Sequence, residues 1–302
     1  MNKHAYCIIA HADPDCLRTL LSLLDDSRND IYLLIDRKSD RGKFGDLRLS
    51  RARLTELPRT VDIRWGDISM VEAELELFGR VAASGENYSY VHLLSGADLP
   101  LKSQDYIHAY CESLPAGTNL VSVSRDPGDL RDLRYKTIYR HYLNRHYKSA
   151  RRWRKVGMKT WRLLTIIAQQ ALGIRKSWKG YTLGKGDQWG SMSMDFVRYL
   201  VERKEWILRE FKYVFCADEI YKQTLLLSSP MASTRVVADE EREECKRAID
   251  WGRGAPYTWR REDCEGLLAS DKLFGRKFST QTDRDAVEFI RDSLLGKMNH
   301  AD

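Results

Sequence analysis

The chain has 302 residues, 43% hydrophobic and 31% charged, so it can bury a substantial core and is not a disordered protein. It contains no run of about 18 apolar residues, so we expect no membrane-spanning helix. The apolar run at residues 5–10 is too short for a secretory signal peptide, which favours a cytoplasmic location. The six cysteines are scattered without a C-x-x-C pair, which argues against a zinc site and favours free buried thiols.

The net charge of +7 is concentrated in one segment. Residues 131–179 contain fifteen Lys or Arg and a single acidic residue, Asp132, which gives a net charge of +14 and leaves −7 for the rest of the chain. This asymmetry predicts an acidic partner surface for the segment rather than a uniformly basic protein.

The first 125 residues alternate predicted strands and helices, which is typical of an α/β layer with a mostly parallel sheet. Apolar runs predict strands at residues 5–10, 30–35, 61–65, 90–94 and 119–123. The first helix opens with Asp13 as its cap and Pro14 at its first position, and a second helix spans residues 70–83. Residues 41–58 are predicted to be a charged, irregular connection with a helical turn or two.

Polar residues follow two of the predicted strands. His11 comes directly after the first strand and Asp36 directly after the second. In open α/β sheets ligands bind at the carboxyl ends of the strands, so the two side chains would share a site if the strands are parallel neighbours. A local loop hydrogen bond is the alternative for each. The glycines fit neither G-x-G-x-x-G nor the P-loop pattern, so neither phosphate-binding fingerprint is present.

The basic segment is predicted to be helical, because it contains no proline and few glycines. Tyr and Trp residues are interleaved with its cations, and residues 163–168 form a short apolar patch within it. This mixture suits an anionic membrane surface or nucleic acid. A solvated face with aromatic anchors into the core is the third interpretation.

Residues 194–211 are predicted to form one helix and residues 283–295 a final amphipathic one. Between them, Asp218 and Glu219 stand side by side at the start of a further predicted helix. Acidic residues are favoured in a first turn, because the exposed N–H groups there carry partial positive charge. The functional alternative is a general base held at the edge of a pocket.

Four stretches and the tail of the chain, spread in order over residues 5–280, together resemble the core-2/I-branching β-1,6-N-acetylglucosaminyltransferase family and its relatives, the peptide O-xylosyltransferases. The stretches are residues 5–11 with LIDRK at 34–38, LLSGADLPLK at 93–102, GDQW at 186–189 and ADE at 217–219; the tail motifs are IDW at 249–251 and LFGRKF at 273–278. The chain departs from the family pattern at Asp187, where serine is usual, and at Ala217, where proline is common.

The resemblance implies a GT-A-like α/β fold in a single glycosyltransferase domain, residues 1–302. Within it we expect a nucleotide-binding half at 1–125, a basic helical insertion at 131–179 and a catalytic, diphosphate-binding half at 180–302. The resemblance also implies a UDP-sugar donor, inversion at the sugar carbon and no metal cofactor. The sequence agrees with that absence, because Asp98 follows the fourth strand without a second carboxylate two residues away. The D-x-D spacing of Asp13 and Asp15 falls instead in a predicted helix start.

By the same resemblance, Glu219 is the general base that deprotonates the acceptor hydroxyl. Lys277 and an arginine would neutralise the charge on the leaving diphosphate. Arg247 ranks first as that arginine, with Arg253 and Arg276 as alternatives. His11 and Asp36 would line the uridine pocket. The residues expected to border the sugars are Asp98, Gln188, Trp189 and Asp218.

We therefore expect a metal-independent inverting glycosyltransferase, a bacterial-type family member that builds surface polysaccharide or another glycan. It would move a sugar, GlcNAc first, from a UDP-sugar to an acceptor sugar hydroxyl. The basic segment would hold it on the inner face of the cell membrane, near a lipid-linked acceptor. UDP-xylose, UDP-galactose and UDP-glucose are alternative donors. A nucleic-acid-binding protein is the rival interpretation and ranks lower, because it leaves the ordered motifs unexplained.

Overall fold

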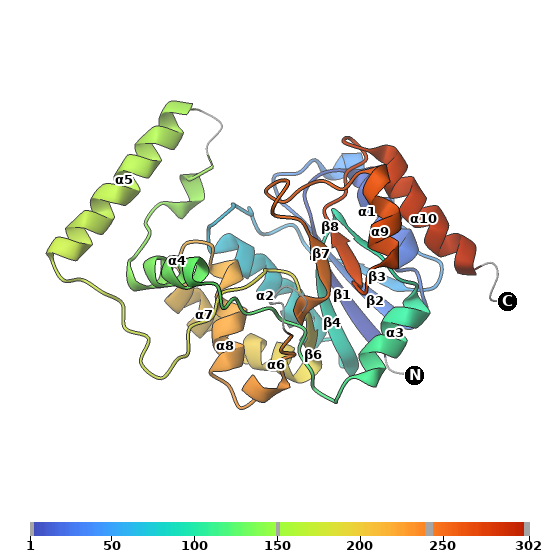
Figure 1. The fold of residues 1–302 in the computed structure, drawn as a ribbon, viewed down its shortest axis with the longest axis horizontal. Helices are drawn as coiled ribbons and strands as arrows, with labels where there is room; N and C mark the ends of the chain where they lie inside the picture. The colour runs from blue at the N-terminus through green and yellow to red at the C-terminus, as the bar shows by residue number, and fades with distance from the viewer. Residues whose placement is uncertain (1–2, 149–151, 239–243, 299–302) are drawn as a thin grey trace.

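The computed structural model describes residues 3–148, 152–238 and 244–298. Its main sheet has five strands in the order β3-β2-β1-β4-β6 (Figure 1). The first four strands run parallel, and β6 is antiparallel to β4. The strands are β1 Lys3–Ala10, β2 Asn29–Ile35, β3 Arg53–Glu56, β4 Tyr88–Ser95 and β6 Ser191–Ser193. The predicted α/β architecture with a mostly parallel sheet is confirmed.

Both faces of this sheet are buried, because the side chains of β1 alternate between two hydrophobic cores. Cys7 and Ile9 point into one core, and Tyr6 and Ile8 into the other. The first core is covered by α2 Ser69–Ala82, α6 Met194–Glu202, α7 Lys204–Phe211 and α8 Tyr221–Leu227. The second is covered by α1 Pro14–Leu23, α3 Gln104–Ser113, α9 Cys264–Ala269 and α10 Arg284–Met298.

A second, smaller sheet joins distant parts of the chain. Its strands are β5 Asp98–Pro100, β8 Phe274–Arg276 and β7 Arg247–Ile249, in the order β5-β8-β7. Residues from before 125 and after 180 therefore pair with each other in both sheets. The functional division at these positions stays a prediction.

The basic segment is helical in part. α4 Pro127–Ile138 covers its start and α5 Arg152–Ala171 its middle, whereas residues 172–190 are irregular. α5 stands at the edge of the molecule, away from the main sheet (Figure 1). Within the described residues, no helix combines the length and the apolarity that a bilayer crossing requires.

Two strand predictions are wrong. Residues 61–65 form no strand, although Val61 is buried, and the third strand is instead β3, inside the segment predicted to be irregular. β3 lies at the sheet edge, and of its four residues, RLTE, only Leu54 is apolar, so the strand has no apolar run to mark it. Residues 119–123 form only isolated bridges, Asn119 with Arg235 and Leu120 with Ser191.

Two helix predictions need correction. Residues 194–211 form two helices, α6 and α7, which are separated at Arg203. Asp218 and Glu219 do not lie in α8. They lie in a separate 3-10 turn, Ala217–Glu219, and Ile220 with φ −127° divides that turn from the helix. The two carboxylates are therefore carried by a turn that precedes the helix.

Candidate active-site cleft

A cleft of about 1240 Å³ opens at the carboxyl ends of the parallel strands. His11 follows β1, Asp36 follows β2 and Ser95 ends β4, and all three line it. Seven of the nine predicted site residues line this cleft. They are His11, Asp36, Gln188, Trp189, Asp218, Glu219 and Lys277. The structure thus gathers residues that are far apart in the sequence.

Glu219 projects into the cleft from the 3-10 turn. Its side chain is 32% exposed, and Lys136 Nζ lies 3.5 Å from its Oε2. Its carbonyl oxygen accepts a hydrogen bond of 2.9 Å from the backbone N–H of Gly186, which fixes the turn against the neighbouring loop. Loss of water contact raises the pKa of Glu219 above its usual range, and the charge of Lys136 opposes this rise. A raised pKa makes the carboxylate a stronger base.

Asp218 is more deeply buried than Glu219. It is 5% exposed, and its Oδ1 has no hydrogen-bond partner among the described residues. Burial, together with the charges of Glu219 and Glu74, raises the pKa of Asp218 to about 8. Two adjacent carboxyls with different exposure cannot ionise equally. Glu219 is the more exposed of the two and lies beside Lys136, so its surroundings favour the ionised form more than those of Asp218 do.

A buried polar network under the cleft supports both carboxylates. Glu74 on α2 accepts hydrogen bonds from Gln188 Nε2 at 2.9 Å and from Tyr221 Oη at 2.6 Å. Lys222 forms an ion pair with Glu74 and also donates to the Asp218 carbonyl oxygen at 3.0 Å. The network therefore links α2, α8 and the loop at 186–189.

Sequence reasoning missed Glu74, although a signal was available. Glu74 lies three residues after Val71 and one before Leu75, on the apolar face of α2, and is fully buried. A carboxylate at a core-facing helix position needs a buried partner. Its place in the apolar pattern of residues 70–83 therefore marks Glu74 as a residue with a specific role.

The positive end of the cleft is formed by Arg276 and Lys277. Arg276 donates to Asp98 Oδ1 at 2.8 Å and to Ser95 Oγ, and its guanidinium stacks on the Trp189 ring at 4.4 Å. β5 and β8 pair Asp98 directly with Arg276. Lys277 has no carboxylate within ion-pair distance among the described residues. Lys277 therefore brings a positive charge to the cleft that no neighbouring acid in the described part of the chain cancels.

Two predicted site residues lie outside the cleft lining. Arg247, ranked first for the diphosphate, is 2% exposed and donates to Ser191 Oγ at 3.0 Å, with its guanidinium against the Phe274 ring. Asp98 is 1% exposed and lies beneath Arg276 instead of facing the cleft. Both predictions of position are corrected: Arg247 packs on Phe274 in the core, and Asp98 is covered by Arg276.

The alternative arginines differ in their surroundings. Arg253 is exposed and pairs with Asp250 at 2.6 Å and Asp263 at 2.9 Å, and it does not line the cleft. Arg276 does line it. Of the three arginines considered from the sequence, Arg276 is therefore the one placed beside Lys277 in the cleft.

His11 and Asp36 face the cleft from adjacent strand ends. Asp36 accepts from the Lys38 backbone N–H at 3.1 Å and pairs with Lys38 Nζ at 2.6 Å. Loss of water contact lowers the pKa of His11, Asp36 opposes this, and the charge of Arg276 lowers it further. His11 is thus held neutral at pH 7, so its ring can both donate and accept a hydrogen bond.

The loop at Gly186–Trp189 depends on its glycine. A Cβ atom at Gly186 would lie 1.9 Å from the Ser122 carbonyl oxygen, so no larger residue fits without a backbone shift. Asp187 bonds the same segment, because its N–H donates to Ser122 Oγ at 2.9 Å. The loop is therefore pressed against residue 122 at the cleft wall.

The cleft holds no group of metal ligands within the described part of the chain. The one set of three His, Cys, Asp or Glu side chains close enough to share an ion, among those same residues, is His4, His92 and Cys111, and it lies in the core. His92 Nε2 is 3.0 Å from His4 Nδ1, and His92 Nδ1 is 2.7 Å from Ser191 Oγ. The imidazole rings of His4 and His92 therefore hydrogen-bond to each other in the core.

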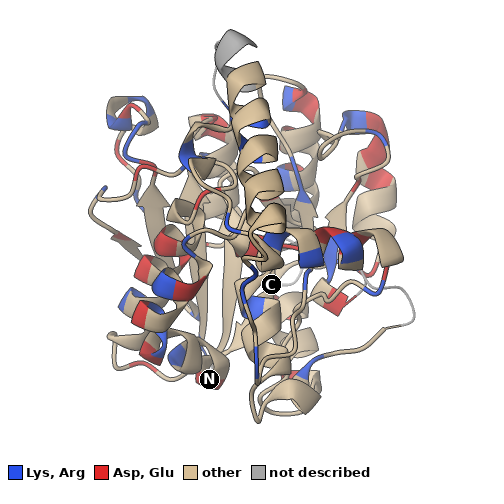
Figure 2. Cartoon of the chain, turned by 90° about the vertical axis from the view of Figure 1, so that its left-hand side faces the viewer, with Lys and Arg blue, Asp and Glu red and all other residues tan. Residues whose placement is uncertain are grey.

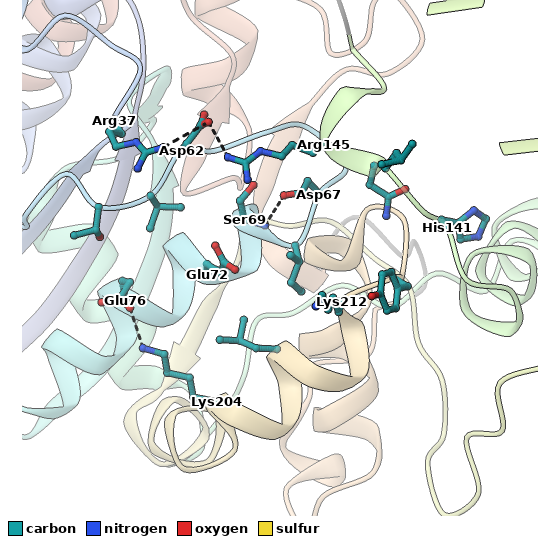
Figure 3. Close-up of a pocket in the computed structure, with 17 residues that line it drawn as sticks. Arg37, Asp62, Asp67, Ser69, Glu72, Glu76, His141, Arg145, Lys204 and Lys212 are labelled. Carbon is teal, nitrogen blue, oxygen red and sulfur yellow. Dashed lines mark hydrogen bonds and ion pairs between the residues drawn. The ribbon is translucent and has the colours of Figure 1, made fainter. Parts of the chain in front are cut away.

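A second cavity of about 610 Å³ lies between α2, α7 and residues 141–145 (Figure 3). None of the predicted site residues lines it. Two ion pairs lie in its lining, with Arg145 2.8 Å from Asp62 and Lys204 2.9 Å from Glu76 (Figure 3).

Comparison with known proteins finds relatives over most of the chain. Residues 4–266 match the family model of the Core-2/I-branching enzymes. The chain is 23% identical over 293 residues to the xylosyltransferase oxt of Drosophila melanogaster, and 24% identical over 293 residues to that of Drosophila pseudoobscura pseudoobscura. Each alignment covers 88% of this chain but 30% of the relative, so the chain spans about a third of its relatives' length.

Among solved structures, the apo form of mouse xyloside xylosyltransferase 1 is similar over 91% of this chain and 97% of that one. The TM-score of this match is 0.38, with 7% sequence identity.

Proposed function

We propose that this chain, which belongs to the Core-2/I-branching enzyme family, is a glycosyltransferase, and that it is an inverting, metal-independent enzyme that transfers a sugar from a UDP-sugar to a saccharide hydroxyl. The observation that carries this proposal is the shared cleft of Glu219 and Lys277. A base and a cation in one cleft are the two groups that such a reaction needs.

In this proposal the donor lies along the strand ends. The uridine contacts His11 and Asp36, and the diphosphate contacts Arg276 and Lys277. Glu219 removes the proton from the acceptor hydroxyl as its oxygen attacks the anomeric carbon on the face opposite the diphosphate. The bond from that carbon to the diphosphate oxygen breaks, and UDP leaves with the electron pair. The two cations stabilise the charge that develops on the leaving group.

The remaining cleft residues orient the sugars. Trp189 offers a ring already stacked on Arg276, and Gln188 is held in place by Glu74. Asp218, protonated at neutral pH, is able to donate a hydrogen bond to a sugar hydroxyl. One ionised carboxylate suffices, because inversion proceeds by a single displacement without a covalent intermediate.

The donor and acceptor belong to the proposal as well. GlcNAc is the first donor sugar, in line with the β-1,6-N-acetylglucosaminyltransferase motifs. Xylose is the first alternative, because both curated relatives are named xylosyltransferases, with galactose and glucose after it. Synthesis of surface polysaccharide and a cytoplasmic location stay predictions.

The test of the catalytic base is Glu219→Gln. UDP release would be measured across a panel of UDP-GlcNAc, UDP-xylose, UDP-galactose and UDP-glucose, with and without oligosaccharide acceptors. We expect transfer to fall by about 10²- to 10⁴-fold, the usual contribution of a general base, while UDP affinity measured by calorimetry stays close to that of the wild type. Asp129→Asn, which removes another cleft carboxylate, is the matched control. Near-normal transfer by Glu219→Gln would exclude Glu219 as the base.

The metal-free mechanism is tested by chelation. Its support is the pair of cleft cations, Arg276 and Lys277, which supply positive charge where a metal-dependent enzyme would hold an ion. We expect the rate of UDP release to be the same in EDTA as in Mn²⁺. Loss of activity in EDTA that Mn²⁺ restores would refute the proposal.

A further inference from the structure

The outer face of α5 is an exposed apolar stripe. Val156, Leu163 and Ile167 recur at intervals of seven and four residues, which places them on one side of the helix. Their exposed fractions are 60%, 56% and 49%, and Leu164 beside them is 56% exposed. A soluble protein rarely leaves so many large aliphatic side chains together in water. The stripe therefore needs a partner.

The opposite face of α5 holds the helix to the body. Ile166 is buried, and Gln169 exchanges two hydrogen bonds of 2.9 Å with the backbone of Arg140. Arg162 donates to His141 at 3.0 Å and stacks on the Phe215 ring at 4.0 Å. Because these contacts fix the rotation of α5, the apolar stripe is directed away from the protein.

The stripe lies in a positively charged stretch of the chain. Lys159, Arg175 and Lys179 are exposed, and the sequence contains no acidic residue from 133 to 179. Figure 2, which views the molecule from the side of α5, shows Lys and Arg on this helix and no Asp or Glu. A helix with an apolar face and uncompensated cations has the composition of a segment that lies in a membrane interface.

Other occupants fit less well. Nucleic acid offers charge for the lysines but no apolar surface for Leu163 and Ile167. A second copy of the chain would bring two faces of the same positive charge together. We propose that the outer face of α5 docks on an anionic lipid bilayer, with the apolar stripe in the boundary between headgroups and acyl chains.

This docking surface connects to the cleft through a short series of contacts. Arg162 on α5 stacks on the Phe215 ring, and Lys136 Nζ lies 5.8 Å from the centre of the same ring. Lys136 Nζ is in turn 3.5 Å from Glu219. The end of the cleft that carries the base is therefore the end tied to α5. Resting on the proposed function, this arrangement places the docked bilayer on the side of the cleft that carries the base.

The experiment is sedimentation of the full chain with vesicles of phosphatidylcholine alone or of phosphatidylcholine mixed with phosphatidylglycerol. We expect binding to the anionic vesicles that weakens as salt rises. Lys159→Ala with Arg175→Ala should lower the partition coefficient by at least about tenfold, since each cation near an anionic surface contributes about fivefold. Leu163→Asp with Ile167→Asp should abolish binding. Val237→Asp, at an exposed apolar residue outside this face, should bind like the wild type.

UDP-sugar hydrolysis and melting temperature are measured on every variant. Neither should change, because the substituted residues of α5 and the stretch after it do not line the cleft and are not part of the core. Equal binding of wild type and the Leu163/Ile167 variant, or no preference for anionic vesicles, would refute the docking surface. The docking surface would also be refuted if the wild type bound duplex DNA tightly and the same variants abolished that binding. A dimer in light scattering that the same variants disrupt would refute it as well. Failure of hydrolysis in the wild type would count against the proposed function and leave the vesicle result to decide the docking surface.

Discussion

At the scale of single residues, neighbouring positions in the tail have opposite surroundings. Arg276 and Lys277 are adjacent in sequence, yet Arg276 is balanced by Asp98 while Lys277 meets no carboxylate among the described residues. Arg247 is buried two strands away from β5 and is held by neutral groups, Ser191 and the Cys245 carbonyl. Of these three cations, Arg276 and Lys277 are the two that can reach a ligand in the cleft.

Because Lys277 lines the cleft and Arg247 is buried, we predict that substituting Lys277 affects catalysis and substituting Arg247 affects stability. Lys277→Met should lower kcat/KM for the donor by about 10²- to 10³-fold, because a preorganised charge at the leaving group is lost, and should leave the melting temperature unchanged. Arg247→Met should instead alter the melting temperature and leave the KM for the donor unchanged. Steady-state UDP release and thermal unfolding check both. A large loss of kcat/KM in Arg247→Met without a change in stability would restore the ranking made from the sequence.

At the scale of elements, the sequence predicted those whose signal is local. Buried strands such as β1 and β2 are continuous apolar runs, and the helices with one apolar face stand out by period. The edge strand β3 could not be found, because its four residues include a single apolar side chain, Leu54, and its pairing with β2 leaves no mark in the local sequence. The break at Arg203 between α6 and α7 likewise has no proline or glycine to mark it.

The same contrast between local signals and long-range pairing explains which site residues could be predicted. The ordered motifs located seven cleft residues, because those residues sit in short stretches with fixed spacing. They could not tell which tail arginine enters the cleft, since that depends on the pairing of β5, β8 and β7. Glu74 was marked by its place on the apolar face of α2, but its partners, Gln188 and Lys222, could not be named, because they are more than a hundred residues away.

At the scale of the whole molecule, the buried histidines set the response to acid. Burial lowers the pKa of His4 to about 3, that of His108 to about 4 and that of His141 to about 4, and it lowers the pKa of His92 well below its usual value. Each is neutral when folded but takes up a proton near pH 6.5 when unfolded. Their contribution to stability is therefore present above pH 6.5 and is lost as pH falls toward the folded values.

The two cleft carboxylates act in the opposite direction. The pKa values of Asp218 and Glu219 are raised in the folded protein, so the folded state binds protons more tightly than the unfolded chain between about pH 4 and the folded values. Their effect on stability is most favourable at low pH and is lost as pH rises through that window. Because four histidines lose stabilising free energy in this pH range while two carboxylates gain it, the histidines decide how the free energy of unfolding changes between pH 7 and 5.

We therefore predict that the free energy of unfolding, measured by urea titration, falls by about 2–5 kcal/mol from pH 7 to pH 5. His108→Gln should reduce this loss, because it removes one buried imidazole while a side-chain amide remains able to bond Asn29. His146→Gln, at an exposed histidine, is the matched control and should leave the loss unchanged. Equal or greater stability at pH 5 would mean that the carboxylates outweigh the histidines, and the assignment of neutral rings throughout the core would have to be abandoned.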